Sequence, residues 1–308
     1  MSKIVLALGG NALGNTPKEQ EKLIKDTSSA IVDLIANNHE VVIVHGNGPQ
    51  VGMIKNPFDA EAKIGKGPLL PLYTAGAMSQ GYIGLDLQKG IKNELNKRKI
   101  NRNVSCLITQ TEVSEKDKAF KNPTKPIGSF YEEKEAKKLA KENGWIVKED
   151  AGRGWRQVVA SPLPTSIIEI ESIKTLLDSN IIPICTGGGG IPTIVKKGNL
   201  LSVDAVIDKD NAASLLATEL KADKLVILTA VDRVSINYNK PDQKELEKMT
   251  IKECDKHIKD GQFAPGSMLP KIEAAKRFVV NNPGKQALIA SLEKAKDALE
   301  GKSGTIIE

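Results

Sequence analysis

Four short runs of consecutive apolar residues, most of them β-branched, constrain the fold of this chain more than any other feature. Longer segments separate them, and in these the apolar residues recur at helical spacing. A strand with one face in water alternates apolar and polar residues, whereas a continuous run suits a strand covered on both faces. We therefore predict an α/β fold with a mostly parallel sheet between helices. The runs are residues 4–8, 41–44, 181–185 and 225–228.

A helix is predicted shortly after the first run. Thr16 has the chemistry of an N-cap, Pro17 suits the first helical position, and Glu19 completes a capping box. Apolar residues then recur at helical spacing until Asn37 and Asn38. Later helices are predicted at 132–142, at about 168–177 and up to residue 220, with further strands at 286–290 and 305–307.

Two stretches interrupt the alternation of strands and helices. Residues 115–165 are charged and contain many prolines and glycines, so we predict an inserted subdomain or lid there. Residues 233–245 are polar and carry turn-forming residues, which predicts a loop. A chain of 308 residues is long enough for one large α/β domain or for two lobes.

The net charge of +6 and the isoelectric point near 9.0 raise nucleic acid as a partner. The lysines are scattered, however, and no basic tract carries interleaved aromatic residues, so we expect an anionic small substrate and no nucleic acid. No run approaches the roughly 20 apolar residues of a membrane helix, and residues 4–8 are too few for a signal peptide core. Cys106, Cys185 and Cys254 form no metal-binding pattern, which predicts reduced thiols in a cytoplasmic protein.

Three glycine-containing loops follow predicted strands. In an open parallel sheet, ligands bind beyond the carboxyl ends of the strands, and glycine lets backbone amides approach an anion. A single glycine loop often does no more than turn the chain, but three at equivalent positions favour a phosphate site. Lys296 stands where a P-loop would begin, and Pro49 interrupts the nearest dinucleotide-like spacing. The loops are Gly9-Gly10-Asn11, Gly46-Asn47-Gly48 and Gly187-Gly188-Gly189-Gly190.

Three charges alternate at Asp208, Lys209 and Asp210, directly after an apolar stretch and before a predicted helix that begins near Ala212. A solvated surface seldom needs that arrangement. A site that holds a polyphosphate against a fixed cation does. The run by itself therefore favours a functional role over a surface role.

Two further lysines occupy constrained positions. Lys271 follows Pro270 in the first turn of a predicted helix, where a cation opposes the helix dipole unless both face one phosphate. Lys125 lies between two prolines, in a stiffened loop. Taken singly, Lys271 is equally well explained as a solvated side chain, and for Lys125 that explanation is favoured.

Fixed lysines and backbone amides together suit phosphoryl transfer, in which catalysis is mainly positioning and electrostatic stabilisation. The sequence offers no convincing general base, because His39, His45 and His257 lie in no catalytic pattern, and His45 is better explained by a structural role. An acceptor that is already an anion, such as a carboxylate or a carbamate, needs no base.

These segments together resemble the amino-acid-kinase superfamily and, within it, the carbamate kinases. The resemblance runs over essentially the whole chain. Residues 122–128, with Pro-Thr-Lys-Pro, and residues 152–156, Gly-Arg-Gly-Trp-Arg, look specific to the carbamate kinases. The other segments that carry it are 7–13, 45–52, 77–81, 187–192, 206–210 and 266–271.

The resemblance implies an enzyme that transfers a phosphoryl group reversibly between ATP and carbamate, usually from carbamoyl phosphate and MgADP toward ATP. It also implies an open three-layer αβα sandwich, a homodimer, and Mg²⁺ that accompanies the nucleotide. The whole chain would be one domain, with an acceptor and phosphate lobe at 1–195 and a nucleotide-binding lobe at 196–308.

By motif match, the resemblance also implies roles for individual residues. The catalytic set is Lys125, Lys209, Asp210 and Lys271. The acceptor and phosphate set is Gly9, Gly10, Asn11, Gly46, Asn47, Gly48, Gly187, Gly188 and Gly189. The nucleotide set is Lys209, Thr229, Ala230, Val231, Ser235, Met268 and Lys271, and no protein residue is expected to bind a metal.

The chain departs from the family pattern at a few positions. Ala230 stands where the family usually has an acidic residue, and Ser235 where it usually has tyrosine, which raises a question about nucleotide affinity. Ala160 and Asn211 are further departures. Two alternatives stay open: a related kinase with another small anionic acceptor, and a catalytically silent homologue that binds nucleotide or carbamoyl phosphate.

Overall fold

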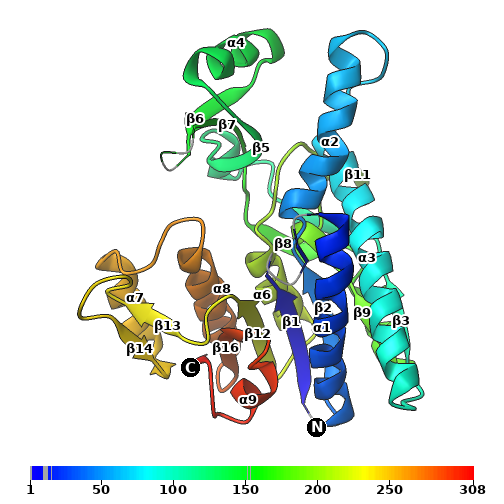
Figure 1. Cartoon of the computed structure of the whole chain (residues 1–308), viewed down its shortest axis with the longest axis vertical. Coiled ribbons are helices and arrows are strands. Elements are labelled where there is room, and N and C mark those ends of the chain that lie inside the picture. Colours follow the sequence, from blue (N-terminus) through cyan, green and yellow to red (C-terminus); the bar gives the residue numbers. More distant parts are fainter. Residues whose placement is uncertain (1, 10–12, 15, 151, 153) are drawn as a thin grey trace.

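An eight-stranded sheet forms the centre of the molecule (Figure 1), in the order β15-β17-β16-β12-β1-β2-β9-β3. The computed structural model describes residues 2–9, 13–14, 16–150, 152 and 154–308. Adjacent strands are parallel except for the antiparallel pair β16 and β17. The strands are β1 (Lys3–Leu8), β2 (Glu40–His45), β3 (Asn103–Cys106), β9 (Ile181–Ile184), β12 (Lys224–Thr229), β15 (Lys248–Met249), β16 (Gln286–Ser291) and β17 (Thr305–Ile307).

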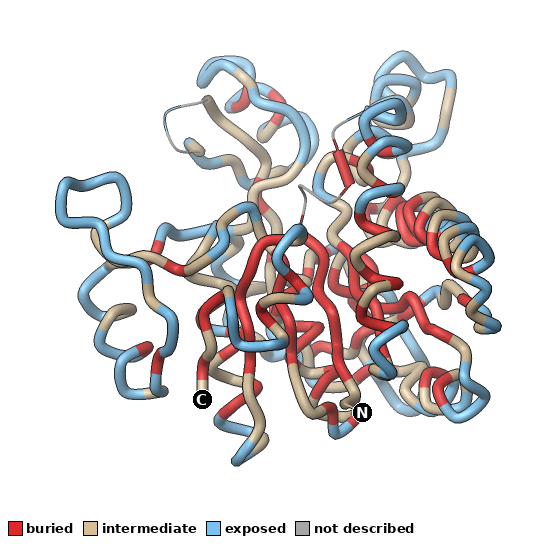
Figure 2. The backbone as a smooth tube through the Cα atoms, turned by 60° about the horizontal axis from the view of Figure 1, so that its bottom comes forward, coloured by how far each residue is buried: buried red, intermediate tan, exposed pale blue. Residues whose placement is uncertain are grey.

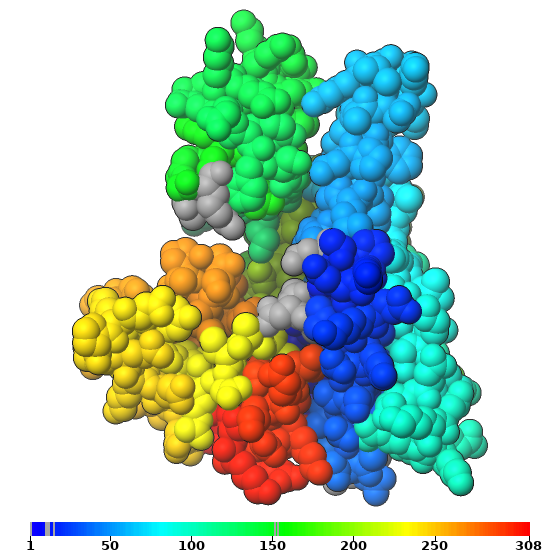
Figure 3. Space-filling model, in the orientation of Figure 1, coloured from blue at the N-terminus to red at the C-terminus, as the bar shows by residue number. Residues whose placement is uncertain are grey.

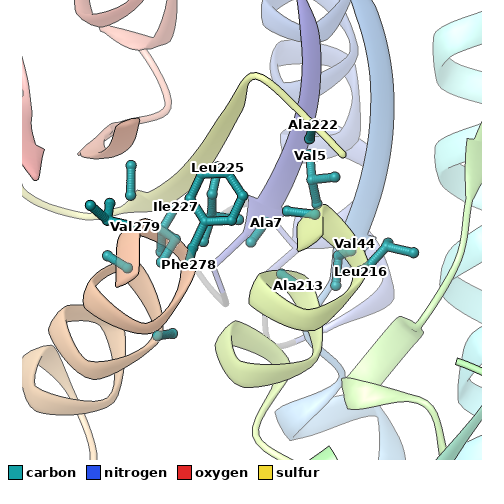
Figure 4. Close-up of a cluster of buried hydrophobic side chains, with 14 of the residues drawn as sticks. Val5, Ala7, Val44, Ala213, Leu216, Ala222, Leu225, Ile227, Phe278 and Val279 are labelled. Atoms are coloured by element: carbon teal, nitrogen blue, oxygen red, sulfur yellow. The ribbon is translucent and has the colours of Figure 1, made fainter. Parts of the chain in front are cut away.

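Strand β1 explains why the apolar runs are continuous. Val5 and Ala7 join one core cluster, shown in Figure 4, while Ile4, Leu6 and Leu8 join a second cluster. Successive side chains of a strand point to opposite faces, so both faces of β1 are buried (Figure 2). The predicted αβα sandwich is therefore confirmed. The first cluster involves α5 (Ile170–Asp178), α6 (Lys209–Glu219), α7 (Ile251–Lys259) and α8 (Met268–Asn281), and the second α1 (Pro17–Ala36), α3 (Leu72–Lys97) and α9 (Ala295–Leu299).

Helix α1 begins and ends where the sequence predicts. The Thr16 side chain accepts a hydrogen bond from the Glu19 backbone N–H at 3.2 Å, and Pro17 is the first helical residue. Asn37 caps the other end, and Asn38 adopts a left-handed conformation with φ 60°. Within the described part of the chain, no helix is both long and apolar enough to cross a membrane.

A small antiparallel sheet, β5-β7-β6, projects beyond the carboxyl edge of the central sheet together with helix α4 (Figure 1). It forms the small inserted subdomain that the sequence predicts, although the boundaries 115–165 stay a prediction. Helix α2 (Gly48–Lys63) contacts β5 of this subdomain. The subdomain elements are β5 (Lys125–Tyr131), α4 (Glu133–Asn143), β6 (Ile146–Glu149) and β7 (Trp155–Val159).

The smaller β structures differ from the sequence-based expectation. The sequence predicts a loop at residues 233–245, but β13 (Val234–Ile236) and β14 (Lys244–Leu246) pair there as a hairpin. Val234 is buried in the core and anchors the hairpin there. The polar composition of the rest of the segment gives no sign of this contact. A second sheet, β11-β10-β4-β8, is also absent from the sequence-based prediction. Its strands are β4 (Gln110–Val113), β8 (Pro164–Ile167), β10 (Ile191–Lys196) and β11 (Asn199–Ser202).

Candidate active site

Strands β1, β2 and β9 are neighbours in the sheet and run parallel. Their carboxyl ends therefore lie side by side at one edge of the sheet. Gly9 follows β1, Gly46 follows β2, and Gly187 comes shortly after β9. All three glycines line one cleft of about 410 Å³. Figure 3 shows the molecule hollowed between the inserted subdomain and the segment around α8. Gly10 and Asn11, predicted for the same site, lie outside the described residues.

This cleft brings together most of the residues that the sequence proposes for acceptor binding and catalysis. They come from the glycine loops, from β5 of the subdomain, and from the starts of α6 and α8. Among the described residues of that set, Gly189 is the exception: it is buried and does not line the cleft. The lining includes Gly9, Gly46, Asn47, Gly48, Lys125, Gly187, Gly188, Lys209, Asp210 and Lys271, with Arg156 and Asp208 in addition.

Helix α6 begins earlier than the sequence suggests, at Lys209 instead of near Ala212. Asp208 is its N-cap, and the Asp208 Oδ1 atom accepts a hydrogen bond from the Asp210 backbone N–H at 3.0 Å. The other oxygen, Oδ2, accepts from Lys125 Nζ at 2.9 Å. Asp208 therefore both starts the helix and holds the subdomain lysine at the cleft.

Asp210 is 3% exposed and is hydrogen-bonded to the other two lysines, Lys209 and Lys271. It accepts hydrogen bonds from Lys209 Nζ and, at 2.9 Å, from Lys271 Nζ. Burial by itself would raise the pKa of the Asp210 carboxyl, but the attraction of the two lysines outweighs burial and lowers the pKa to about 2. Burial lowers the pKa of Lys209, against the attraction of Asp210. Asp210 is thus an ionised organiser of the two lysines.

Two carboxylates therefore face three lysines in the cleft, which leaves one excess positive charge in this cluster. The first turns of α6 and α8 add the positive ends of two helix dipoles. A phosphate group gains from both contributions in a partly enclosed cleft. Arg156 is a further cation of the lining, and its guanidinium donates to Asp150 and to the Gly128 carbonyl.

The run of four glycines is required by close packing. Gly188 has φ +66°, and a Cβ there would lie 2.2 Å from Asn47 Nδ2. Gly189 has φ +95°, and a Cβ there would lie 2.3 Å from the Ile207 carbonyl oxygen. Any larger residue would be strained and would displace a neighbour. The second and third glycine loops are therefore in direct contact through Asn47.

His45 lies under the glycine loops and is 1% exposed. Its Nδ1 is 2.8 Å from the Gly46 carbonyl oxygen, which can only accept, so Nδ1 carries the proton. Burial lowers the pKa of His45 to about 4, so the imidazole is neutral at physiological pH. This geometry supports the structural role expected for His45.

The residues proposed for the nucleotide do not come together in the same way. Lys209 and Lys271 line the main cleft, whereas Thr229 and Ala230 line a neighbouring cavity of about 390 Å³ that shares Gly9. Val231, Ser235 and Met268 line neither cavity. Ser235 lies on β13, where its hydroxyl accepts from the Gln243 side chain at 3.4 Å, and Met268 packs against the first core cluster.

Carboxylates for a protein-bound metal are scarce at this site. Within residues 2–9, 13–14, 16–150, 152 and 154–308, no group of three or more His, Cys, Asp or Glu side chains is placed to hold a metal ion. The two aspartates of the cleft are already paired with lysines.

Sequence reasoning gives no role to Asp208 as a partner of Lys125, or to Ser79 and Gln80 of α3. Asp208 has a local signal, because an acidic residue directly before a helix is a common N-cap. Gln80 contacts a residue 107 positions away in the chain, and nothing in the local sequence could have indicated that.

Comparison with known proteins agrees with the fold. The sequence profile of the amino acid kinase family matches residues 2–291. The chain therefore belongs to the amino acid kinase family, a class of phosphotransferases.

Its similar relatives within that family include carbamate kinases and a carbamate kinase-like protein. The carbamate kinase of Staphylococcus haemolyticus is 53% identical over the full length of both chains. The carbamate kinase-like protein YqeA of Escherichia coli is 53% identical over 99% of this chain and 98% of its own. The structure of the Giardia lamblia carbamate kinase bound to AMP-PNP superimposes with a TM-score of 0.92 at 47% identity, covering 99% of this chain and 98% of that one.

Proposed function

We propose that the chain is a carbamate kinase that transfers a phosphoryl group reversibly between ATP and carbamate, and that it runs mainly from carbamoyl phosphate and MgADP toward ATP. The observation that carries the proposal is the convergence of Lys125, Lys209 and Lys271 on one cleft lined by glycine loops. The carbamate kinases among its relatives support the choice of acceptor.

In this proposal the three lysines stabilise the charge on the oxygens of the transferring phosphoryl group. Asp208 holds Lys125, and Asp210 holds Lys209 and Lys271, so the cations are positioned before the substrates arrive. Amides of the second and third glycine loops face the carbamoyl side. No general base takes part, because a carbamate oxygen is already anionic.

The nucleotide approaches from the α6 and α8 side, where Lys209 and Lys271 lie. We propose residues 1–195 as the acceptor lobe and 196–308 as the nucleotide lobe, with Thr229, Ala230, Val231, Ser235 and Met268 on the nucleotide side. Mg²⁺ enters with ATP or ADP and is held mainly by the phosphate oxygens, as is usual for this ion.

We also propose a homodimer. Met78 and Leu85 are exposed on the outer face of α3, and Leu200 and Leu201 are exposed on β11, whose partner strand β10 contacts α3. Exposed apolar side chains on neighbouring elements favour a protein contact.

The purified protein is expected to form ATP from carbamoyl phosphate and MgADP with no other substrate. In Lys209→Ala, the rate is expected to fall about 10²–10³-fold, because a buried cation is removed from the reacting phosphate. ATP formation is measured directly, and circular dichroism confirms that the variant is folded.

Two outcomes would count against this function. If the wild-type protein forms no more ATP than Lys209→Ala, the silent homologue is the better description. If acetyl phosphate supports ATP formation as fast as carbamoyl phosphate does, a kinase of another small anionic acceptor is favoured.

Lys271→Ala is expected to lower turnover about 10²-fold while lowering the unfolding free energy by only about 1.5–3 kcal/mol, the usual contribution of a hydrogen bond to a charged group. Asp210 keeps Lys209 as its partner in this variant. The matched control is Lys276→Ala, on the same helix, where the lysine pairs with Asp255 away from the cleft. Equal losses of turnover in both variants would show that Lys271 acts only in folding.

A further inference from the structure

Helix α3 carries two adjacent buried polar residues that have no role in the reaction as proposed above. Ser79 is 0% exposed and Gln80 is 1% exposed. Neither lines the cleft. Buried polar side chains are costly unless they are hydrogen-bonded, so their partners indicate what they are for.

The side-chain amide of Gln80 makes three hydrogen bonds. Its Nε2 donates to the Gly187 carbonyl at 3.0 Å and to the Thr109 carbonyl at 3.1 Å, and its Oε1 accepts from the Thr109 backbone N–H at 2.8 Å. The two carbonyls can only accept and the N–H can only donate, so one orientation of the amide satisfies all three. Gln80 thereby ties the third glycine loop to α3.

Ser79 holds the second glycine loop in a comparable way. Its Oγ accepts from Asn47 Nδ2 at 2.8 Å and donates to the Gly76 carbonyl at 2.6 Å. The Asn47 amide in turn packs against Gly188. Two consecutive residues of one helix therefore hold the two loops that face each other in the cleft.

The contact with Gly187 also sets the direction of an amide in the cleft lining. The peptide unit is planar and trans, so its N–H points away from its carbonyl oxygen. When Gln80 holds the Gly187 carbonyl, the N–H of Gly188 is directed to the opposite side of that peptide. A run of four glycines has high conformational freedom, so this loop depends on such contacts more than an ordinary turn does.

We propose that Ser79 and Gln80 are positioning residues that set the spacing and orientation of the second and third glycine loops for the carbamoyl phosphate side of the reaction. The kinetic part of this inference rests on the proposed function. The structural part, that Gln80 orders the Gly187 loop, does not.

The chain supplies a matched control. Gln88 lies farther along α3 and also accepts a backbone hydrogen bond, from the Cys106 N–H to its Oε1 at 2.9 Å. It contacts β3 and is not part of the cleft lining. Gln80→Met and Gln88→Met both replace the amide by an apolar side chain of similar length.

The experiment measures kcat, both KM values and backbone hydrogen exchange for each variant. Gln80→Met is expected to lower kcat/KM for carbamoyl phosphate about 10–10²-fold, since small displacements of positioning groups have effects of this size. The KM for MgADP should change less than about twofold, because the nucleotide side keeps its contacts. Exchange of the amides in residues 185–192 should be faster. Gln88→Met should leave all of these at wild-type values.

If Gln80→Met does not fold, Ser79→Ala tests the same proposal, and it is expected to lower kcat/KM for carbamoyl phosphate without changing the KM for MgADP. Equal kinetics in Gln80→Met and Gln88→Met, or unchanged exchange in residues 185–192, would overturn the proposal. A wild-type protein that forms no ATP would refute the proposed function instead, and the exchange measurement would still decide whether Gln80 orders the loop.

Discussion

Asp210→Asn is expected to lower turnover about 10²–10³-fold, because the residue that positions two of the three cleft lysines loses its charge. Asparagine has nearly the same shape as aspartate, but its amide nitrogen cannot accept from a lysine. Removing one partner of a buried ion pair costs about 3–5 kcal/mol, so the unfolding free energy should fall as well. Steady-state kinetics and chemical denaturation measure the two losses.

The control for this substitution is Asp223→Asn. Asp223 also pairs with a lysine, Lys285, and accepts from the Lys3 backbone N–H, but its side chain is 41% exposed and lies outside the cleft. Surface ion pairs contribute only about 0–1 kcal/mol, so turnover should be unchanged and stability nearly so. Similar turnover losses in both variants would remove the special role of Asp210.

The dependence on pH gives a second test of Asp210, on the acid side. Its pKa is about 2 in the folded protein, against an ordinary value of 3.8, so its contribution to stability is complete above pH 3.8 and is lost as the pH falls toward 2. That contribution is about 2 kcal/mol. The stability difference between the wild-type protein and Asp210→Asn should therefore shrink over this range.

The alkaline side tests the link between Asp210 and Lys209. Because the pKa of Lys209 is lowered, activity should decline with rising pH at a lower pH than the one at which an ordinary lysine loses its proton. In Asp210→Asn the attraction of the carboxylate is gone, so the decline should move to still lower pH. An unchanged alkaline limb would contradict the proposed link.

The central sheet could be predicted from sequence because β1, β2 and β12 each contain a continuous apolar run, and both faces of such a run must be covered. The second sheet could not be predicted, since β11 is exposed along its whole length and β4 has only four residues. Helix α2 is hidden by Gly48 and an internal Pro57, both of which weaken helical propensity.

The candidate site shows the same division. The glycine loops could be expected to converge because they follow strands of one parallel sheet. The pairing of Lys125 with Asp208 joins residues 83 positions apart, and the Gln80 contact spans 107 positions. Such contacts depend on how the subdomain and α3 lie against the sheet, and no local pattern encodes that.

Gly188→Ala is expected to lower kcat/KM for carbamoyl phosphate about 10–10²-fold, because the new Cβ would displace the Asn47 amide and with it the second glycine loop. A control with the same kind of backbone strain is available in Gly198→Ala, since Gly198 has φ +79° and no heavy atom outside Gly198 and its two chain neighbours lies within 4 Å of the position that its Cβ would take. Both substitutions force alanine into the left-handed region at a cost of about 1–2 kcal/mol.

The two alanine variants therefore separate backbone strain from the contact between the loops. Both should lose similar unfolding free energy from strain, with an additional loss in Gly188→Ala from the crowded Asn47, whereas only Gly188→Ala should lose activity. Denaturation and steady-state kinetics on the two proteins measure this. If Gly198→Ala loses as much activity as Gly188→Ala, the loss reflects general destabilisation. If neither loses activity, the contact between Asn47 and Gly188 does not set the acceptor geometry, and the three lysines would have to position carbamoyl phosphate without it.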